Sequence, residues 1–186
     1  MFPKGFLWGA STAAHQVEGG NNNDWTVWEQ KNCRNLAITA KERLRAQGGY
    51  GFSDTRLNRF TKEISDPKNY ISGLSSDHYH RFREDFDLVK SLGHNAHRFS
   101  IEWSRIEPAP GRFNEPELDH YAEVIKELKD RGIEPVITLW HWTLPIWFSQ
   151  QGGFESGESP VLFARFVGCC FRSRPELPKK PQPPRL

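Results

Sequence analysis

From about Ser76 onward the sequence alternates between helical and strand patterns, and this alternation constrains the fold more than any other feature. Helical stretches carry apolar residues three or four positions apart, and strand-like stretches are short apolar runs. Together with a first strand over 7–13, the predicted order is helix 77–92, strand 95–101, helix 114–131, strand 135–140 and helix 159–167. Such an order predicts an α/β fold with parallel strands and crossover helices.

Two architectures fit this order: an open doubly wound sheet and a (β/α)8 TIM barrel, of which only about the first three βα units would be present. Ser75, Ser76 and Asp77 are predicted to cap the first long helix, and Asn114 with Glu117 is predicted to form a capping box for the second. A polar insertion over 21–73 follows the first strand, with a predicted helical part over 36–47.

Composition limits the partners and the cellular compartment. The 25 basic and 23 acidic residues leave a net charge of +2, which argues against nucleic acid or an anionic membrane surface as the partner. The sequence has no apolar run as long as a membrane span. Cys33, Cys169 and Cys170 lack the spacing of a disulfide framework or a metal site, so we expect reduced thiols in a cytoplasmic protein.

Three polar residues lie in or just after the predicted strands: Gln16, Arg98 and His141. Ligands of α/β folds bind beyond the carboxyl ends of the strands, so we expect these side chains to converge there. Gln and neutral His can each donate and accept hydrogen bonds, which suits sugar hydroxyls, whereas Arg offers a permanent positive charge. Taken singly, a Gln at a strand end is more often a loop cap, and a His between Trp140 and Trp142 is more often a satisfied core residue than a ligand contact.

Arg98 interrupts an apolar strand, and an unpaired buried charge is costly, so we expect an acidic partner for it. The residue pattern does not separate a structural ion pair from an active-site pair. The triplet Asn114-Glu115-Pro116 opens a predicted helix, so we interpret it as a capping element.

The sequences of three segments closely resemble those of glycoside hydrolase family 1, the β-glucosidase and β-galactosidase family. The segments are FLWGASTAAHQVEGG at 6–20, HRFSIEWSR at 97–105 and TLWHWTLP at 138–145. The Gly152-Gly153-Phe154 turn is also similar to that family, and the order and spacing agree. The resemblance covers residues 2 to about 167 and implies a TIM barrel.

The resemblance implies roles for particular residues. Gln16 and His141 would bind hydroxyls of the sugar whose bond is cleaved, Trp142 would flank that sugar, and Arg98 would lie beside the nucleophilic carboxylate. Glu18, Trp103 and Arg105 belong to the same segments, and we expect structural roles for them. The family hydrolyses β-glycosides with retention, using two carboxyl groups about 5–5.5 Å apart, and this chemistry requires no metal or organic cofactor.

The sequence lacks both segments that carry the catalytic carboxylates of the family. The family carries its acid/base in a Thr-x-Asn-Glu-Pro segment and its nucleophile in a Glu-Asn-Gly segment, and both segments are absent from the sequence. We therefore expect a β-glucosidase-type enzyme in truncated form, inactive alone, with a poorly stable or partly molten fold. The alternatives are a non-catalytic carbohydrate-binding protein and a fragment that depends on assembly with another chain.

The final residues, 168–186, differ in composition from the rest, with five prolines and five basic residues. We expect one barrel domain over 1–167 and a disordered tail outside the family pattern over 168–186. A natural linker and a shifted or prematurely ended reading frame both explain the tail. The second is favoured because the change falls within a predicted helix.

Overall fold

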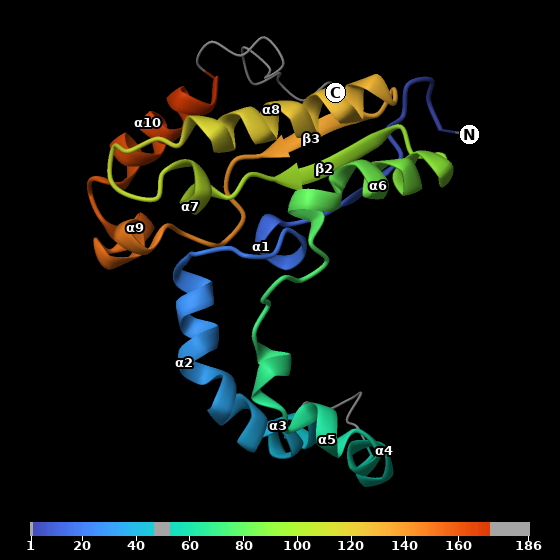
Figure 1. Ribbon diagram of the computed structural model, residues 1–186, viewed down its shortest axis with the longest axis vertical. Coiled ribbons are helices and arrows are strands. Elements are labelled where there is room, and N and C mark those ends of the chain that lie inside the picture. Colours follow the sequence, from blue (N-terminus) through green and yellow to red (C-terminus); the bar gives the residue numbers. More distant parts are fainter. Residues whose placement is uncertain (1, 47–52, 172–186) are drawn as a thin grey trace.

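Three short parallel strands form the centre of the molecule. The computed structural model describes residues 2–46 and 53–171. Strands β1 (Gly9–Ser11), β2 (Ala96–Ser100) and β3 (Glu134–Thr138) form one sheet in the order β1-β2-β3 (Figure 1). The register aligns Ser11 with Arg98 and Ser100 with Thr138. The predicted parallel α/β arrangement is therefore observed, although β1 is shorter than expected.

Each strand is followed by helix, as the apolar periodicity predicts. Between β1 and β2 lies α6 (His78–Ser91), between β2 and β3 lies α8 (Glu115–Asp130), and after β3 comes α10 (Ser159–Phe171). Shorter helices occupy the loops after β2 and β3: α7 (Trp103–Ile106), α9 (Ile146–Gln150) and η2 (Gly153–Glu155).

The last helix extends beyond Val167, where the sequence pattern was expected to change. Phe166 and Cys170 are four residues apart on one helical face, and both are fully buried, which explains why α10 continues to Phe171. Burial also raises the pKa of the Cys170 thiol to about 12. The rest of the predicted tail, 172–186, lies outside the described residues.

Two predicted helix caps are not formed. Asp77 precedes α6 in the left-handed region without a side-chain capping bond, and its carboxylate contacts His80 Nδ1 at 2.7 Å instead. Asn114 precedes α8 without a side-chain capping bond, and Glu117 accepts a hydrogen bond from the Tyr79 hydroxyl at 3.0 Å. The capping-box prediction was wrong because Glu117 binds a neighbouring helix rather than its own helix start.

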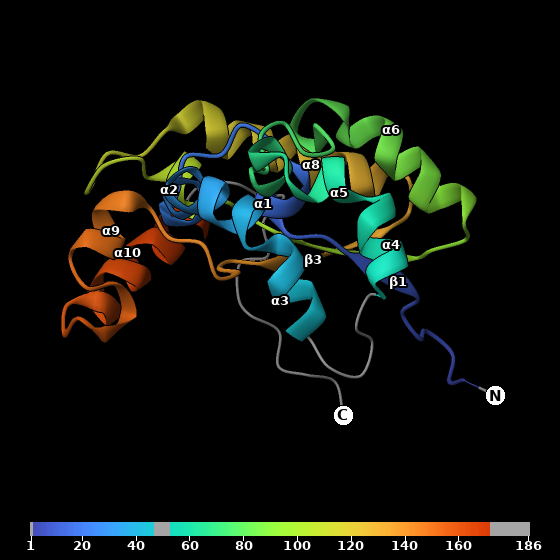
Figure 2. The same ribbon diagram turned by 90° about the horizontal axis from the view of Figure 1, so that it is seen from below.

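The hydrophobic core lies on one side of the sheet. Figure 2 shows α6 and α8 on that side, and the fully buried Phe86, Ile125 and Leu128 come from these two helices. The core continues towards α10, where Trp103 stacks on Phe166 with ring centroids 4.7 Å apart. All three residues of β1 are exposed.

The insertion, residues 21–73, is more helical than predicted. Figure 1 shows it projecting from the rest of the chain as an arm, with α2 beside the returning segment that leads to α6. The predicted helix over 36–47 is divided between two helices. The helical segments are α2 (Asp24–Ile38), α3 (Ala40–Ala46), α4 (Asp54–Arg59), α5 (Thr61–Ile64) and η1 (Pro67–Tyr70).

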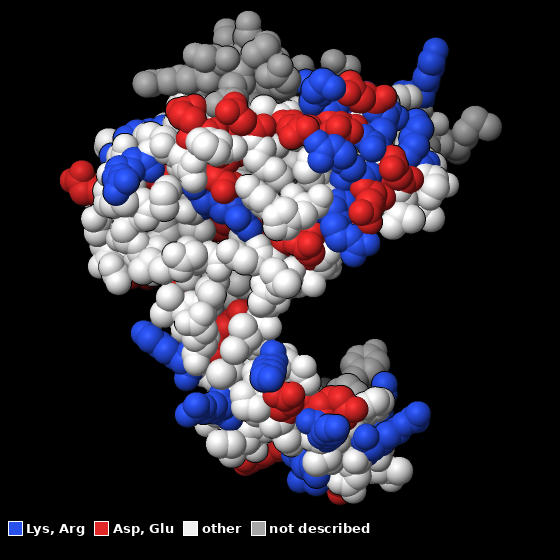
Figure 3. All heavy atoms as spheres, in the orientation of Figure 1, with Lys and Arg blue, Asp and Glu red and all other residues white. Residues whose placement is uncertain are grey.

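Charged side chains of both signs alternate over α6 and α8 (Figure 3). Arg83 of α6 pairs with Glu123 and Glu127 of α8, and Arg131 pairs with Asp87 and Glu127. Arg83, Glu123 and Asp87 are largely exposed, whereas Arg131 and Glu127 are partly buried. Pairs near the surface contribute at most about 1 kcal/mol each, but together they link the two helices. Within the described residues, no helix has the length and apolar character needed to cross a membrane.

Candidate functional site

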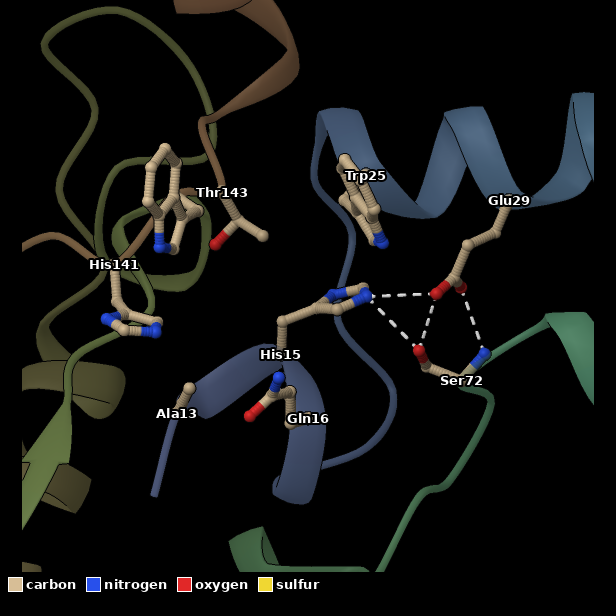
Figure 4. A pocket seen from close by; sticks show the side chains of 9 residues that line it. Ala13, His15, Gln16, Trp25, Glu29, Ser72, His141 and Thr143 are labelled. Carbon is tan, nitrogen blue, oxygen red and sulfur yellow. Dashed lines mark hydrogen bonds and ion pairs between the residues drawn. The ribbon is translucent and has the colours of Figure 1, made fainter. Parts of the chain in front are cut away.

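A pocket of about 390 Å³ opens where β1 and β3 deliver their following loops (Figure 4). This volume is within the range of about 300–1,000 Å³ that is typical of ligand sites. The core of the fold and the insertion both contribute to its lining, which consists of Ala13, His15, Gln16, Trp25, Glu29, Ser72, His141, Trp142 and Thr143.

The short helix α1 (Ala14–Val17) brings Gln16 to the pocket. Its start is held by β2, because the Ala14 amide donates to Ser100 Oγ at 2.8 Å and the Thr12 amide donates to the Arg98 carbonyl at 3.0 Å. Gln16 itself is exposed, so its side-chain amide faces solvent and can meet a ligand.

His141 and Trp142 reach the same pocket from the loop after β3. Trp142 has φ 73°, in the left-handed region that residues other than glycine rarely adopt, and it is 77% exposed. Backbone strain of this kind persists only where the surrounding structure imposes it, and it is frequent at binding sites. The structure thus brings together Gln16, His141 and Trp142, which the sequence placed at different strand ends.

Arg98 has no acidic partner in the part of the chain that the structure describes, which contradicts the expectation of an ion pair within it. Its guanidinium donates to Thr138 Oγ1 at 2.8 Å and to His141 Nδ1 at 3.4 Å. The side chain is only partly buried, so neutral acceptors and solvent suffice. Because Arg98 can only donate, His141 Nδ1 must accept, and the proton of neutral His141 then lies on Nε2.

Glu18 and Arg105 form a buried pair beside the pocket. Arg105 Nε donates to Glu18 Oε2 at 2.9 Å, and the Tyr121 hydroxyl donates to Glu18 Oε1 at 2.9 Å. Burial raises the pKa of Glu18 to about 7, although Arg105 and Tyr121 act in the opposite direction. Arg105 also lies 4.2 Å above the Tyr79 ring. These contacts lie outside the pocket lining and join α1 to α6 and α8.

The sequence did not predict a role for four residues that connect α1 with the insertion, which we call the His15 cluster: His15, Asn23, Glu29 and Ser72. Ser72 donates to Glu29 through its hydroxyl at 2.6 Å and through its backbone amide at 2.9 Å. His15 Nε2 lies 3.2 Å from Glu29 Oε1 and 3.1 Å from Ser72 Oγ. Figure 4 shows these contacts. Glu29 and Ser72 are 43 positions apart, and no local pattern relates them.

The fully buried Asn23 sets the orientation of His15. Its Oδ1 accepts from the amide and the hydroxyl of Thr26, at 2.9 and 3.0 Å, so its Nδ2 must face His15 Nδ1 at 3.2 Å. His15 Nδ1 therefore accepts, and Nε2 carries the proton directed at Glu29.

The hydrogen bonds of the cluster determine the charge of Glu29. Burial acts to raise its pKa, but the two hydrogen bonds from Ser72 and the contact with His15 outweigh burial and lower the pKa of Glu29. Glu29 is therefore an ionised carboxylate at neutral pH, and its oxygens are already engaged by Ser72 and His15. A carboxylate held in this way is suited to positioning its neighbours rather than to proton transfer.

Neither of the other features considered in the sequence provides a catalytic group. Asn114-Glu115-Pro116 stands at the start of α8, between β2 and β3, although Asn114 forms no side-chain capping bond there. Among residues 2–46 and 53–171, no group of three or more His, Cys, Asp or Glu side chains is arranged to hold a metal ion.

Known proteins resemble this chain in both sequence and structure. The β-glucosidase A of Acetivibrio thermocellus is 33% identical over 176 residues, covering 92% of this chain and 33% of that protein. An aryl-phospho-β-D-glucosidase of Bacillus subtilis is 37% identical over 161 residues, covering 83% of this chain and 28% of that protein. A solved β-glycosidase from Pyrococcus horikoshii superposes with a TM-score of 0.68 at 35% identity, covering 91% of this chain and 32% of that one.

The chain spans about a third of the length of these relatives. Its three-stranded parallel sheet and crossover helices correspond to the first βα units of their (β/α)8 barrels. The family model for glycosyl hydrolase family 1 matches residues 1–179. With nearly the whole sequence matched and the strand order in agreement, this chain belongs to glycosyl hydrolase family 1.

Proposed function

We propose that this chain supplies the first part of a retaining β-glycosidase of the β-glucosidase type, together with part of its sugar-binding site. The observation that carries this proposal is the shared pocket of Gln16, His141 and Trp142 at the carboxyl ends of the strands. Balanced charge and a largely uncharged pocket favour a neutral glycoside as the ligand.

Each of these residues has a role that its chemistry supports. The Gln16 amide can donate to one hydroxyl and accept from the next, and the Nε2 proton of His141 can be donated to a third. The exposed Trp142 ring can stack on the C–H face of the same sugar. Arg98 holds His141 and offers a positive charge near the position of the nucleophilic carboxylate of the family.

The reaction itself requires two carboxyl groups, one serving as acid and then base, the other as nucleophile. The sequence contains neither the Thr-x-Asn-Glu-Pro nor the Glu-Asn-Gly segment that carries them in the family. We therefore expect the isolated 186-residue chain not to hydrolyse glycosides, since loss of even one such group reduces rates by several orders of magnitude.

The test is sugar binding, measured by NMR titration of the chain with methyl β-D-glucoside. Weak, millimolar binding is expected for the unmodified chain, and Gln16→Ala or His141→Ala should abolish it. His80→Ala is the matched control, because His80 is exposed and does not line the pocket. Equal binding by all variants would refute the assignment of the site, and turnover of an aryl β-glucoside by the isolated chain would refute the expected inactivity.

A second function in a different class is a non-catalytic carbohydrate-binding protein, or a fragment active only in assembly. It is supported by the same pocket, whose polar groups are suited to sugar hydroxyls and whose Glu29 is already engaged by Ser72 and His15. Calorimetry separates the two functions, because a dedicated binding protein would hold glucose or cellobiose well below millimolar concentrations.

We also propose that the protein is cytoplasmic. The proposal rests on the odd number of cysteines without framework spacing, which is typical of proteins from a reducing compartment. Fractionation of producing cells followed by detection of the chain in the soluble or membrane-associated fraction would test it.

A further inference from the structure

The loop after β3 contains a tight turn of a rare type. The Thr143 amide donates to the His141 carbonyl at 3.0 Å, and Trp142 between them has φ 73°. A hydrogen bond that spans one residue of positive φ forms a γ-turn of the uncommon, strained kind. The turn places Trp142 at the pocket beside His141, whose ring contacts Arg98. Contacts that hold this turn therefore also set the shape of the pocket.

Two contacts fix the residues that directly follow the turn. The Thr143 hydroxyl donates to Glu102 Oε2 at 3.1 Å, and the Leu144 amide donates to Asp24 Oδ1 at 2.8 Å. The Asp24 amide in return donates to the Leu144 carbonyl at 3.0 Å. The exit of the turn is thus attached to the start of α2 and to a carboxylate from the loop after β2.

Glu102 connects two parts of the pocket at once. It is the second residue after β2, and only 1% of its surface is exposed. Its Oε2 accepts from the Asn23 amide at 3.2 Å as well as from Thr143, and its Oε1 accepts from the Ser104 hydroxyl at 2.8 Å. Asn23 in turn orients His15 at the pocket. One carboxylate therefore joins the loop after β3 to the start of the insertion.

The partners of Glu102 differ from those of nearby buried glutamates. Glu18 pairs with Arg105 and Glu107 pairs with Arg165, whereas the described side chains that bind Glu102 are all neutral. A buried carboxylate without a cationic partner is costly to the stability of a fold. Its hydrogen bonds to the two pocket loops therefore indicate a role in placing those loops.

We propose that Glu102 is a positioning residue of the sugar-binding site, which holds Trp142 in its strained turn through the hydroxyl of Thr143. The inference rests on the proposed function, because it takes the bound sugar to lie against Trp142. The hold on the turn itself exists in the free chain and can be tested without a ligand. A turn that is already formed does not have to be selected by the sugar, so its release lowers affinity.

The position requires a group that only accepts hydrogen bonds. An N–H donor is directed at each oxygen of Glu102, from the Asn23 amide at Oε2 and from the Ser104 backbone at Oε1. A glutamine at this position would turn its NH2 group towards one of these donors in either orientation. Glu102→Gln should therefore release the turn despite its equal size. Because Glu102 is buried, Thr143→Val gives the sharper test, since it leaves the carboxylate and its other donors in place.

The experiment compares Thr143→Val, which removes the hydroxyl but keeps the branched shape, with Thr143→Ser, which keeps the hydroxyl. In the free 186-residue chain, NMR reports the turn through the NOE between the amide and α protons of Trp142, which is strong when φ is positive. Thr143→Val should weaken this NOE and reduce the affinity for methyl β-D-glucoside about fivefold. Thr143→Ser should preserve both the NOE and the affinity.

Thr39→Val is the matched control, because Thr39 is half-buried like Thr143, donates its hydroxyl to the Asn35 carbonyl at 2.8 Å and does not line the pocket. It should change neither the NOE nor the affinity. An unchanged NOE and affinity in Thr143→Val would overturn the positioning role and leave the proposed function intact.

Two further results would also overturn the positioning role. A weaker NOE without loss of affinity would show that the turn does not matter for the sugar, and equal losses in Thr143→Val and Thr143→Ser would show that the hydroxyl is not responsible. Absence of sugar binding by the unmodified chain would instead refute the proposed function. The NOE in Thr143→Val would then still decide whether Glu102 holds the turn.

Discussion

Trp142 combines an unfavourable backbone conformation with an exposed side chain. Its φ of 73° costs on the order of 1–2 kcal/mol, and with 77% of its surface exposed the ring recovers little of this by packing. The same position places the ring at the edge of the pocket beside His141. Strain without compensating burial is what a binding residue shows when the fold is optimised for a ligand rather than for stability alone.

Replacing Trp142 separates the cost of its backbone conformation from its role in ligand binding. Trp142→Gly should stabilise the chain by about 1 kcal/mol in urea unfolding, because glycine adopts positive φ without strain, and should abolish binding of methyl β-D-glucoside. Trp142→Ala should also lose binding but keep the strain, and therefore gain much less stability. Equal stability of the two variants would show that the backbone at this position is not strained.

The buried His97 and the half-buried His120 make stability depend on pH in one direction, and the buried Glu18 makes it depend on pH in the other. Burial lowers the pKa of His97 and His120 from 6.5 to about 4, so the unfolded chain binds protons below pH 6.5 that the folded chain does not. The stability from these histidines is present above pH 6.5 and is lost as the pH falls towards 4. Burial raises the pKa of Glu18 from 4.5 to about 7, so its contribution is present below pH 4.5 and is lost as the pH rises through 7.

The two histidines outweigh the one glutamate between pH 4.5 and 6.5, so the urea midpoint of the chain should rise with pH over this interval. The rings of His120 and Tyr79 are stacked with their centroids 3.9 Å apart. His120→Phe keeps a ring at this position and removes one titrating group. The variant should show a nearly flat profile over the same interval. Profiles that stay parallel would contradict the assignment of the pH dependence to His120.

Some of the site could be predicted from single residues. Gln16 and His141 follow predicted strands, and parallel strands deliver their following residues to one edge, so their shared pocket follows from the pattern. Arg98 lies within a predicted strand and contacts His141. The contribution of Glu29 and Ser72 could not be predicted in this way. Their contact spans the whole insertion and depends on how the arm folds back, which no local spacing encodes.

The turn that joins α1 to the insertion is an element with little tolerance for change. Gly19 has φ 80°, and a Cβ there would lie 2.0 Å from the carbonyl oxygen of Leu74 at the far end of the insertion. The two ends of the insertion therefore touch through backbone. Gly20, the next residue, has φ 64° but has open space around its Cβ position.

This pair allows a matched comparison. Gly20→Ala should cost about 1 kcal/mol of unfolding free energy from its backbone conformation alone. Gly19→Ala should cost considerably more, because the backbone of Leu74 must also move, and it should disturb the His15 cluster nearby. Urea unfolding measures both changes. Equal costs would mean that the approach of Gly19 to Leu74 is not tight in solution.

At the level of elements, the long helices and the strand order could be predicted, whereas helix starts and the insertion could not. The helices α6 and α8 have clear apolar periodicity and one buried face each. Their caps depend on neighbouring partners such as Tyr79 for Glu117, which are set by tertiary packing. The insertion has weak periodicity, and its helices are stabilised by contacts such as that of Glu29 with Ser72.

Considered as a whole, the described chain leaves much apolar surface exposed. Within the described residues, β1 and β3 each pair on one side only, and Phe2, Phe6 and Trp8 pack on one another while remaining 61%, 40% and 49% exposed. Sheet edges and apolar clusters of this kind favour association and loose packing.

The isolated chain should therefore bind the dye ANS and should unfold with low cooperativity. Phe6→Ser should lower dye binding and self-association measured by size-exclusion chromatography, because it breaks the contacts with Phe2 and Trp8. Phe60→Ser is the control, since Phe60 has similar exposure, 41%, and lies in the insertion. A sharp, two-state transition without dye binding would contradict this expectation of a loosely packed chain.

The meeting of the two ends of the insertion has a consequence for how such a protein can diversify. Because Gly19 contacts Leu74 and Glu29 binds Ser72, the first and last residues of the arm are held together at its base. The part of the insertion from the end of α2 through α5 can therefore change in length or sequence without altering the contacts of Gly19 with Leu74 and of Glu29 with Ser72. We therefore expect changes in the outer part of the arm to leave the pocket unaltered, because the arm residues that line the pocket, Trp25, Glu29 and Ser72, lie near its base.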